Sequence, residues 1–127
     1  MKIVVLVARL LLALIFVVFG LNGFLHFISQ PPPSGVAAQF VGALFVSHYL
    51  IVVFVLQLGT GVLLLINRYV PLALTLLGPV IFNILLFHSF MKPDGLPLAL
   101  IVTLLWLVTA WSVRSAFAGI FQQNVQQ

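Results

Sequence analysis

Hydrophobic and polar positions along the chain separate into four long apolar segments joined by short polar ones. The apolar segments cover about residues 3–27, 38–66, 70–90 and 97–114. A helix of roughly 20 apolar residues crosses the hydrocarbon core of a bilayer, and segments of about 17 to 25 residues are typical. The pattern therefore predicts four membrane-spanning helices in a single domain over residues 1–127, with residues 115–127 as a fraying tail.

The connecting segments are too short and too rich in helix-breaking residues to form further domains. Three consecutive prolines, Pro31 to Pro33, exclude a helix between the first two spans. Pro79 predicts a kink in the third span, and Asp94 is placed to cap the fourth helix. Short connections place consecutive helices antiparallel, so we expect an all-α, up-down-up-down four-helix bundle.

The composition agrees with a membrane protein and excludes several other classes. Hydrophobic residues make up 64% of the chain and charged residues 5%, whereas a soluble domain carries roughly 25% charge. The absence of cysteine excludes a disulfide scaffold, and no glycine-rich phosphate motif is present. The net charge of +4 comes from scattered residues that form no basic face, which argues against nucleic acid as a partner.

The basic residues predict an orientation. With four spans, Lys2, Arg9, Arg68 and Arg114 fall on the side of the two termini, and only Lys92 falls on the other. Cytoplasmic ends of membrane proteins carry an excess of lysine and arginine. We therefore expect both termini in the cytoplasm, with Arg9 and Arg68 as anchors on that side. Arg9 lies about one turn inside the membrane, where it either reaches the headgroups along its own stem or anchors a buried partner.

Three stretches together resemble a known family. The run of residues 9–16 leads to Gly20-Leu21-Asn22-Gly23-Phe24; a run from Gly61 to Leu74 contains Asn67-Arg68-Tyr69-Val70-Pro71; and Gly78-Pro79-Val80-Ile81-Phe82-Asn83-Ile84 precedes Phe87-His88. Over residues 5–90 this resembles the DoxX family and its DoxX-like relatives, small four-span proteins of the bacterial inner membrane. Family members often carry a lysine after the first-span glycine, where this chain has Gly23 or Phe24.

The resemblance implies a fold more firmly than an activity, because one fold hosts many functions. The family takes its name from a subunit associated with a terminal oxidase, and relatives are linked to thiosulfate:quinone oxidoreduction, to oxidative-stress enzymes and to receptor assembly. It implies a multi-pass inner-membrane protein that serves as an accessory or quinone-interacting subunit of an oxidoreductase. A non-enzymatic assembly or interaction protein is the alternative, and a transporter of a small solute or lipid is the third reading.

Polar residues inside the apolar segments are candidates for a ligand site, because such residues are costly in a membrane. We expect an outer pair, His26 and His88, and a deeper set, Asn22, His48 and Asn83. The first interpretation is structural, with these side chains bonding between helices. In the second, neutral histidine and asparagine bond the carbonyls of a quinone or another lipid headgroup, and in the third, histidine pairs hold haem. No cysteine, and no carboxylate within the spans, completes a metal site or a catalytic triad, so we assign no catalytic residue.

Small residues predict where helices approach closely. Gly20 and Gly23 leave a slot on the first helix, and Gln57, Gly61 and Leu64 share one face of the second, with Thr60 beside them. These slots serve packing within the bundle or, as the alternative, contact between copies in a homo-oligomer. Membrane lipids are the remaining expected partners.

Overall fold

A computed structural model describes residues 1–126 of the chain, and within that range every regular element is a helix. In chain order the elements are α1 (Lys2–Leu25), α2 (Gly35–Val46), α3 (Tyr49–Leu65), α4 (Val70–Phe90), the 3₁₀ turn η1 (Pro93–Gly95), α5 (Leu96–Ser112) and the 3₁₀ helix η2 (Arg114–Phe121).

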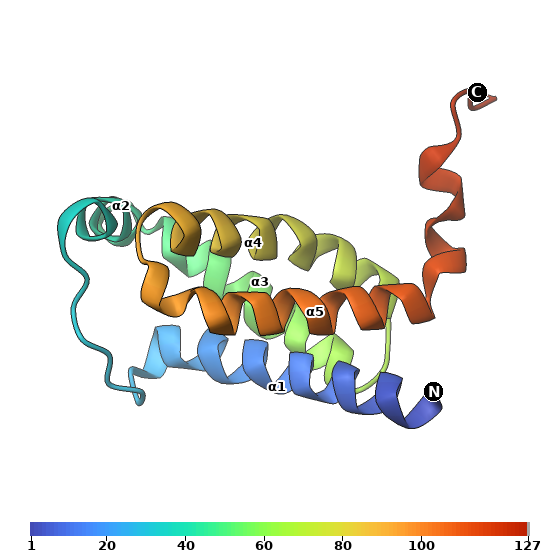
Figure 1. Cartoon of the computed structure of the whole chain (residues 1–127), viewed down its shortest axis with the longest axis horizontal. Helices are drawn as coiled ribbons and strands as arrows, with labels where there is room; N and C mark the ends of the chain where they lie inside the picture. The colour runs from blue at the N-terminus through green and yellow to red at the C-terminus, as the bar shows by residue number, and fades with distance from the viewer. Residues whose placement is uncertain (127) are drawn as a thin grey trace.

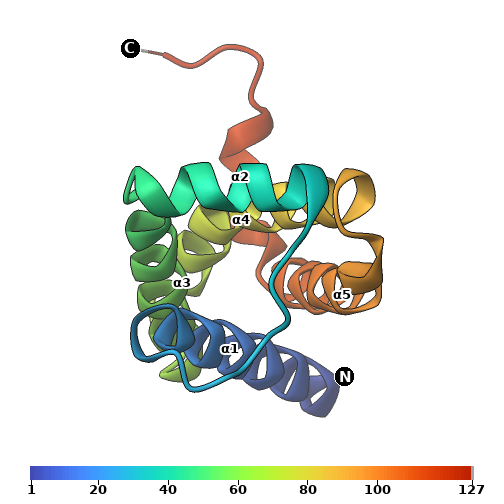
Figure 2. The same ribbon diagram turned by 90° about the vertical axis from the view of Figure 1, so that its left-hand side faces the viewer.

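Four helices, α1, α3, α4 and α5, surround a common core. Figure 1 shows that they run in alternating directions, and Figure 2 shows them arranged around the long axis in the order α1, α3, α4, α5. The core is aliphatic apart from one phenylalanine and includes Leu12 and Phe16 of α1, Leu64 of α3, and Leu74 and Leu77 of α4. The predicted all-α class is confirmed.

The helices are long and apolar enough to cross a membrane. The segments Lys2–Leu25, Val70–Phe90 and Pro93–Ser112 each qualify alone, and α2 with α3 forms a fourth span only if the bent pair is taken as one. Large apolar side chains cover the outer surface, for example Val52, Phe82 and Leu104, each about 60% exposed. Such a surface is stable against lipid rather than water. The chain is therefore a small multi-pass helical membrane protein.

The predicted second span, residues 38–66, is not one continuous helix. It is divided at Ser47 and His48 into α2 and α3, whose axes differ by 86°. His48 takes a left-handed conformation with φ 64°, and the Ser47 hydroxyl accepts from the Tyr49 N–H and donates to the Leu44 carbonyl. A serine hydroxyl that bonds nearby backbone competes with helical hydrogen bonds, which explains why a helix ends at this point.

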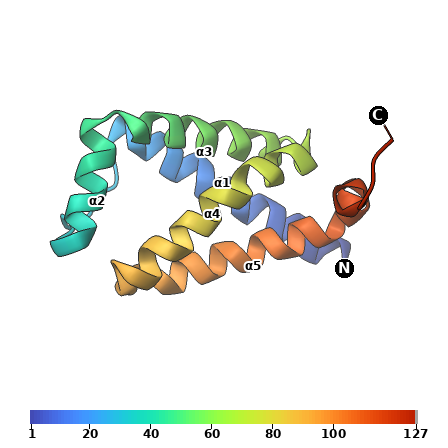
Figure 3. The same cartoon turned by 90° about the horizontal axis from the view of Figure 1, so that it is seen from above.

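After the bend, α2 lies across one end of the bundle, which we call the α2 end. Figure 3 shows α4 leaving the neighbourhood of α3 as it runs from their shared turn toward this end, while α2 crosses the gap. The ring of Phe40 in α2 meets that of Phe87 in α4 with centroids 5.7 Å apart. This contact joins α2 to α4, and no pattern within residues 38–66 encodes it.

Three helix ends differ from the sequence prediction. α1 stops at Leu25 because His26 is left-handed and the Asn22 side chain accepts from the Ile28 N–H at 2.7 Å. Asp94 does not cap α5 and instead pairs with Lys92 at 3.1 Å. The predicted fraying tail is helical up to Phe121, and the last residue of that tail, 127, lies outside the described part of the chain.

The closest helix contact is between α1 and α3, and it depends on glycine. A Cβ added to Gly20 would lie 2.9 Å from the Leu58 backbone nitrogen, and one added to Gly61 would lie 2.9 Å from that of Val17. Any larger residue would therefore meet backbone of the facing helix. The predicted small-residue face of α3 is confirmed, since its buried residues are Gln57, Thr60, Gly61 and Leu64.

Candidate ligand-binding site

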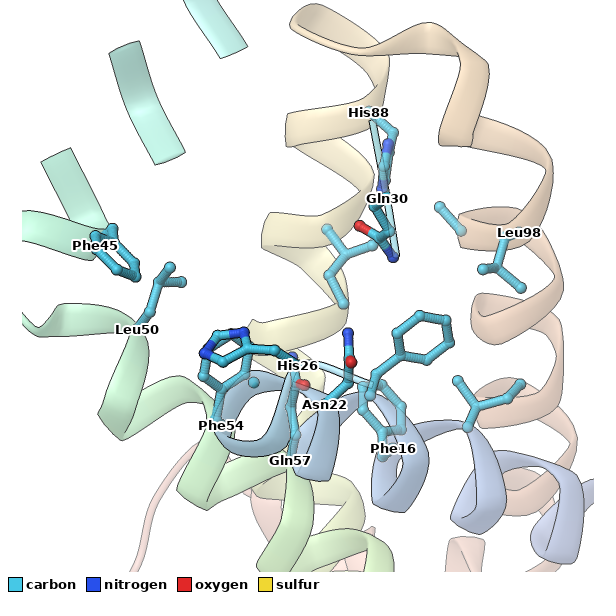
Figure 4. Close-up of a pocket in the computed structure, with 15 residues that line it drawn as sticks. Phe16, Asn22, His26, Gln30, Phe45, Leu50, Phe54, Gln57, His88 and Leu98 are labelled. Atoms are coloured by element: carbon cyan, nitrogen blue, oxygen red, sulfur yellow. The ribbon is translucent and has the colours of Figure 1, made fainter. Parts of the chain in front are cut away.

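Two adjoining hollows occupy the α2 end of the bundle. The first, which we call the polar cavity, has a volume of about 350 Å³ and lies among α1, α3, α4 and α5. Figure 4 shows side chains entering it from several helices. Its polar lining consists of Asn22, His26, Gln30, Gln57 and His88. Phenylalanine and aliphatic side chains form the remainder of the wall.

The second hollow, which we call the apolar groove, has a volume of about 800 Å³ and lies between the α2–α3 pair and α4. It exists because α4 leaves α3 toward the α2 end while α2 crosses the gap (Figure 3). The two hollows adjoin, because both are lined by Leu50, Phe54, Gln57 and Ile84. Both volumes lie within the roughly 300–1,000 Å³ typical of small-molecule sites.

The structure groups the candidate residues differently from the two tiers expected from the sequence. Asn22, His26 and His88 all line the polar cavity. Asn83 lines the apolar groove instead. His48 lines neither hollow; it is exposed at the α2–α3 bend rather than deep within a continuous span. Three of the five predicted ligand residues therefore share one cavity.

The cavity residues on α1 and α4 are held by local hydrogen bonds that leave free groups. Asn22 uses its Oδ1 for the Ile28 N–H, which leaves the two amide hydrogens on Nδ2 as donors. His88 Nδ1 lies 3.1 Å from the Lys92 carbonyl oxygen. A carbonyl can only accept, so Nδ1 carries the proton in this contact and a neutral ring keeps Nε2 as an acceptor.

Other polar side chains on the long helices bond to their own helix. Thr60, Thr75, Thr103 and Thr109 each donate to the carbonyl four residues earlier, at 2.5 to 2.8 Å. Asn83 does the same through Nδ2, which donates to the Pro79 carbonyl at 2.8 Å. These residues satisfy their polarity locally, as hydroxyl and amide groups in apolar helices commonly do. Their presence in a span therefore needs no ligand.

Gln57 is different from these residues. It is only 8% exposed, it lines both hollows, and its side chain forms no hydrogen bond with any part of residues 1–126. Among the described residues no fully enclosed side-chain polar atom lacks a partner, so the Gln57 amide must reach the open space of the hollows. An amide that reaches a hollow without a protein partner can bond to a ligand there, and such a hydrogen bond contributes about 0.5–1.5 kcal/mol.

The polar cavity carries no formal charge when its histidines are neutral. Its lining contains no lysine, arginine, aspartate or glutamate. Within residues 1–126, no group of three or more histidine, cysteine or acidic side chains is placed to hold a metal ion. The arrangement offers amide donors from Asn22 and Gln57, and acceptors from Gln57 and His88. Such a set suits an uncharged ligand that has carbonyl or hydroxyl groups.

The two arginines expected to act as anchors behave differently. The Arg9 guanidinium donates to the carbonyl oxygens of Leu64 and Leu65, at the C-terminal end of α3. A cation there satisfies carbonyls that have no partner within their own helix and opposes the helix dipole. Arg68 is exposed in the α3–α4 turn. The sequence left two interpretations of Arg9 open, and in the structure its guanidinium bonds to backbone carbonyls of α3.

Sequence reasoning did not identify the importance of two residues, Gln57 and Trp106. Gln57 was assigned to a packing face, although a glutamine in an apolar span is itself a signal for a binding partner. Trp106 was given no role, yet its Nε1–H donates to the Leu74 carbonyl of α4 at 3.0 Å. An indole in an apolar helix needs such an acceptor, but the sequence does not say which carbonyl lies within reach.

The fold defines a small multi-pass helical membrane protein, and the polar cavity and the apolar groove lie at one end of it. Comparisons with protein-family models, with curated proteins and with solved structures found no match to this chain.

Proposed function

We propose that this chain is a DoxX-like integral membrane protein that binds a quinone in the two hollows at its α2 end. In this role it serves as an accessory subunit of a redox system in the bacterial inner membrane. The observation that carries the proposal is Gln57: the residue is only 8% exposed, it lines both hollows, and its side-chain amide has no hydrogen-bond partner within residues 1–126 and so reaches their open space. The sequence resemblance supplies the redox part.

The chemistry of the lining favours a quinone over a charged ligand. A quinone carbonyl needs a hydrogen-bond donor, which Asn22 Nδ2 and the Gln57 amide supply. The reduced quinol has hydroxyl groups that need acceptors, which Gln57 Oε1 and His88 Nε2 supply. Because neither polar cavity nor groove is lined by a charged side chain, nothing there compensates an ionised headgroup.

The shapes of the two hollows suit an amphipathic molecule with a ring and a long apolar chain. We place the ring in the polar cavity beside Gln57, with the chain in the larger apolar groove. The groove is lined mainly by aliphatic and aromatic side chains such as Phe40, Val53 and Phe87. This placement lets the chain of the ligand leave the protein toward the surrounding lipid.

The charge distribution supports an orientation for this site. Lys2, Arg68 and Arg114 lie at the end of the bundle opposite α2, and the Lys92–Asp94 pair lies at the α2 end. The excess of basic residues places the first end in the cytoplasm by the positive-inside tendency. Both termini are then cytoplasmic, and the quinone site belongs to the outer leaflet.

The test is a lipid extract of the protein purified in mild detergent, analysed by mass spectrometry for quinone per protein. We expect the protein to retain quinone and Gln57→Leu to retain about tenfold less, because losing the hydrogen bond between quinone and the Gln57 amide costs about 1.4 kcal/mol. Leucine fills a similar volume, so the helical circular dichroism and the melting temperature should not fall.

Gln39→Leu is the matched control, because Gln39 is exposed on α2 and lines neither hollow. It should keep the full amount of quinone. If the unmodified protein carries only bulk phospholipid, or if Gln57→Leu retains as much quinone as Gln39→Leu, the quinone proposal is wrong. An assembly or interaction role would then take its place, and a search for a co-purifying protein would follow.

A further inference from the structure

A third cavity lies at the opposite end of the bundle from the quinone site. It has a volume of about 440 Å³ and is bounded by the start of α1, the α3–α4 turn and the end of α5. Figure 1 shows these three segments together at one end of the molecule. We call it the basic cavity, because its polar lining consists of Lys2, Arg9, Asn67, Thr109 and Ser112.

No acidic side chain within residues 1–126 compensates the positive charge of this cavity. The single acidic side chain of the sequence, Asp94, is bound to Lys92 at the far end of the bundle. Lys2 and Arg9 therefore form no salt bridge with a side chain of residues 1–126. Arg9 is partly buried, so its charge is less well hydrated than that of a surface arginine. An anion from outside the chain would compensate it.

The hydrogen-bonding groups also favour an anion. Arg9 uses only Nη1 for the α3 carbonyls, which leaves donors on Nη2 and Nε. Lys2 contributes three donors and the Asn67 amide two more. The hydroxyls of Thr109 and Ser112 already donate to backbone carbonyls of α5, so they do not need an external acceptor.

The remaining wall of the cavity is apolar and reaches the lipid-facing surface. It is formed by Val5 and Leu6 of α1, Val70 of α4, and Val113. Leu6 is 46% exposed, so the cavity is continuous with a surface that faces acyl chains. A ligand that combines an anionic head with an apolar body fits this arrangement better than a fully hydrated ion.

We propose that the basic cavity binds a phosphate group that carries net negative charge, with Lys2 and Arg9 as its cationic ligands and Asn67 as a further donor. The apolar wall favours an anionic phospholipid over free phosphate as the source. The site is separate from the proposed quinone site and does not depend on it. A lipid bound there fixes α1 and α5 to the end of α3 at the basic surface of the membrane.

Native mass spectrometry of the full chain in detergent tests this proposal, with phosphatidylglycerol and phosphatidylcholine added at equal concentrations. We expect the unmodified protein to prefer phosphatidylglycerol. Lys2→Gln should lower phosphatidylglycerol occupancy about fivefold, the effect of one basic residue near a membrane surface. Added inorganic phosphate distinguishes the sources: retention of the lipid identifies a lipid headgroup, and displacement identifies a free phosphate ion as the ligand.

Arg114→Gln is the control, since Arg114 carries the same charge as Lys2 at the same end of the bundle but does not line the basic cavity. Its guanidinium carbon instead lies over the Trp111 ring, 4.5 Å from the centroid. Arg114→Gln should reduce occupancy much less than Lys2→Gln. Equal losses in the two variants would mean that the general positive field, and no site, attracts lipid. Equal binding of the two lipids by the unmodified protein would also overturn the proposal. Helical circular dichroism verifies that each variant is folded.

Discussion

The two sides of α3 pack in opposite ways. Toward α1, Gly20 and Gly61 allow the helices to approach until an added Cβ would meet backbone atoms at 2.9 Å. Toward α4, the helices separate and leave a groove of about 800 Å³ that α2 crosses at one end. In lipid, helix association depends on close packing rather than on exclusion of water. The α1–α3 contact is therefore the tightly packed part of the fold, and the open side of α3 provides space for a ligand.

The largest expected effect comes from disrupting the close contact between α3 and α1. Gly61→Leu must separate α1 from α3, because its side chain would meet Val17 and the Ala13 carbonyl. We expect a loss of about 3 kcal/mol in the free energy of unfolding, typical of severe overpacking. The measurement is thermal unfolding in detergent, followed by circular dichroism.

Gly59→Leu is the control for that variant, because a Cβ added at Gly59, two residues away on the same helix, meets no atom within 4 Å apart from its neighbours in the chain and the backbone of its own helix. It should unfold at the same temperature as the unmodified protein or slightly higher, since leucine favours helix over glycine. Equal destabilisation by both variants would show that the α1–α3 contact does not hold the bundle together.

A second, smaller loss of stability is expected at the C-terminal end of α3, where Arg9 of α1 bonds to backbone carbonyls. Arg9→Gln removes the charged hydrogen bonds to the Leu64 and Leu65 carbonyls, and we expect a loss of about 2 kcal/mol in unfolding free energy. Arg68→Gln removes an exposed charge from the neighbouring turn and should change stability by less than about 0.5 kcal/mol. Urea unfolding in mixed micelles compares the two. Similar losses would contradict a structural role specific to Arg9.

The smallest effect tests the far side of the groove. Trp106→Phe removes the hydrogen bond to the Leu74 carbonyl, which joins α5 to α4 five residues before Pro79. We expect a loss of about 1 kcal/mol, and a lower affinity for any ligand in the groove if α4 then shifts. Trp111→Phe, at a residue 67% exposed, should leave the melting temperature unchanged. Equal melting temperatures for the two variants would contradict a role for this hydrogen bond in holding α4 in place beside the groove.

Much of the candidate site could be read from the sequence, but the grouping of its residues could not. Asn22, His26 and His88 are rare polar residues in apolar segments, and their cost in a membrane marks them without a structure. Asn83 has the same signal, yet it bonds the Pro79 carbonyl of its own helix. His48 has the signal too, but it lies at a bend that depends on where α2 packs. Gln57 gains its importance only from the two hollows beside it.

The sequence by itself determined that the protein is helical and belongs in a membrane, because long apolar runs with six charged residues admit no other stable surface. It also determined the small-residue face of α3, since the spacing of Gln57, Gly61 and Leu64 fixes which side chains share a side. Only the tertiary structure decided that α2 turns by 86° and that α4 separates from α3. These features involve residues far apart in the chain, such as Phe40 and Phe87 whose rings meet, and local pattern does not encode such contacts.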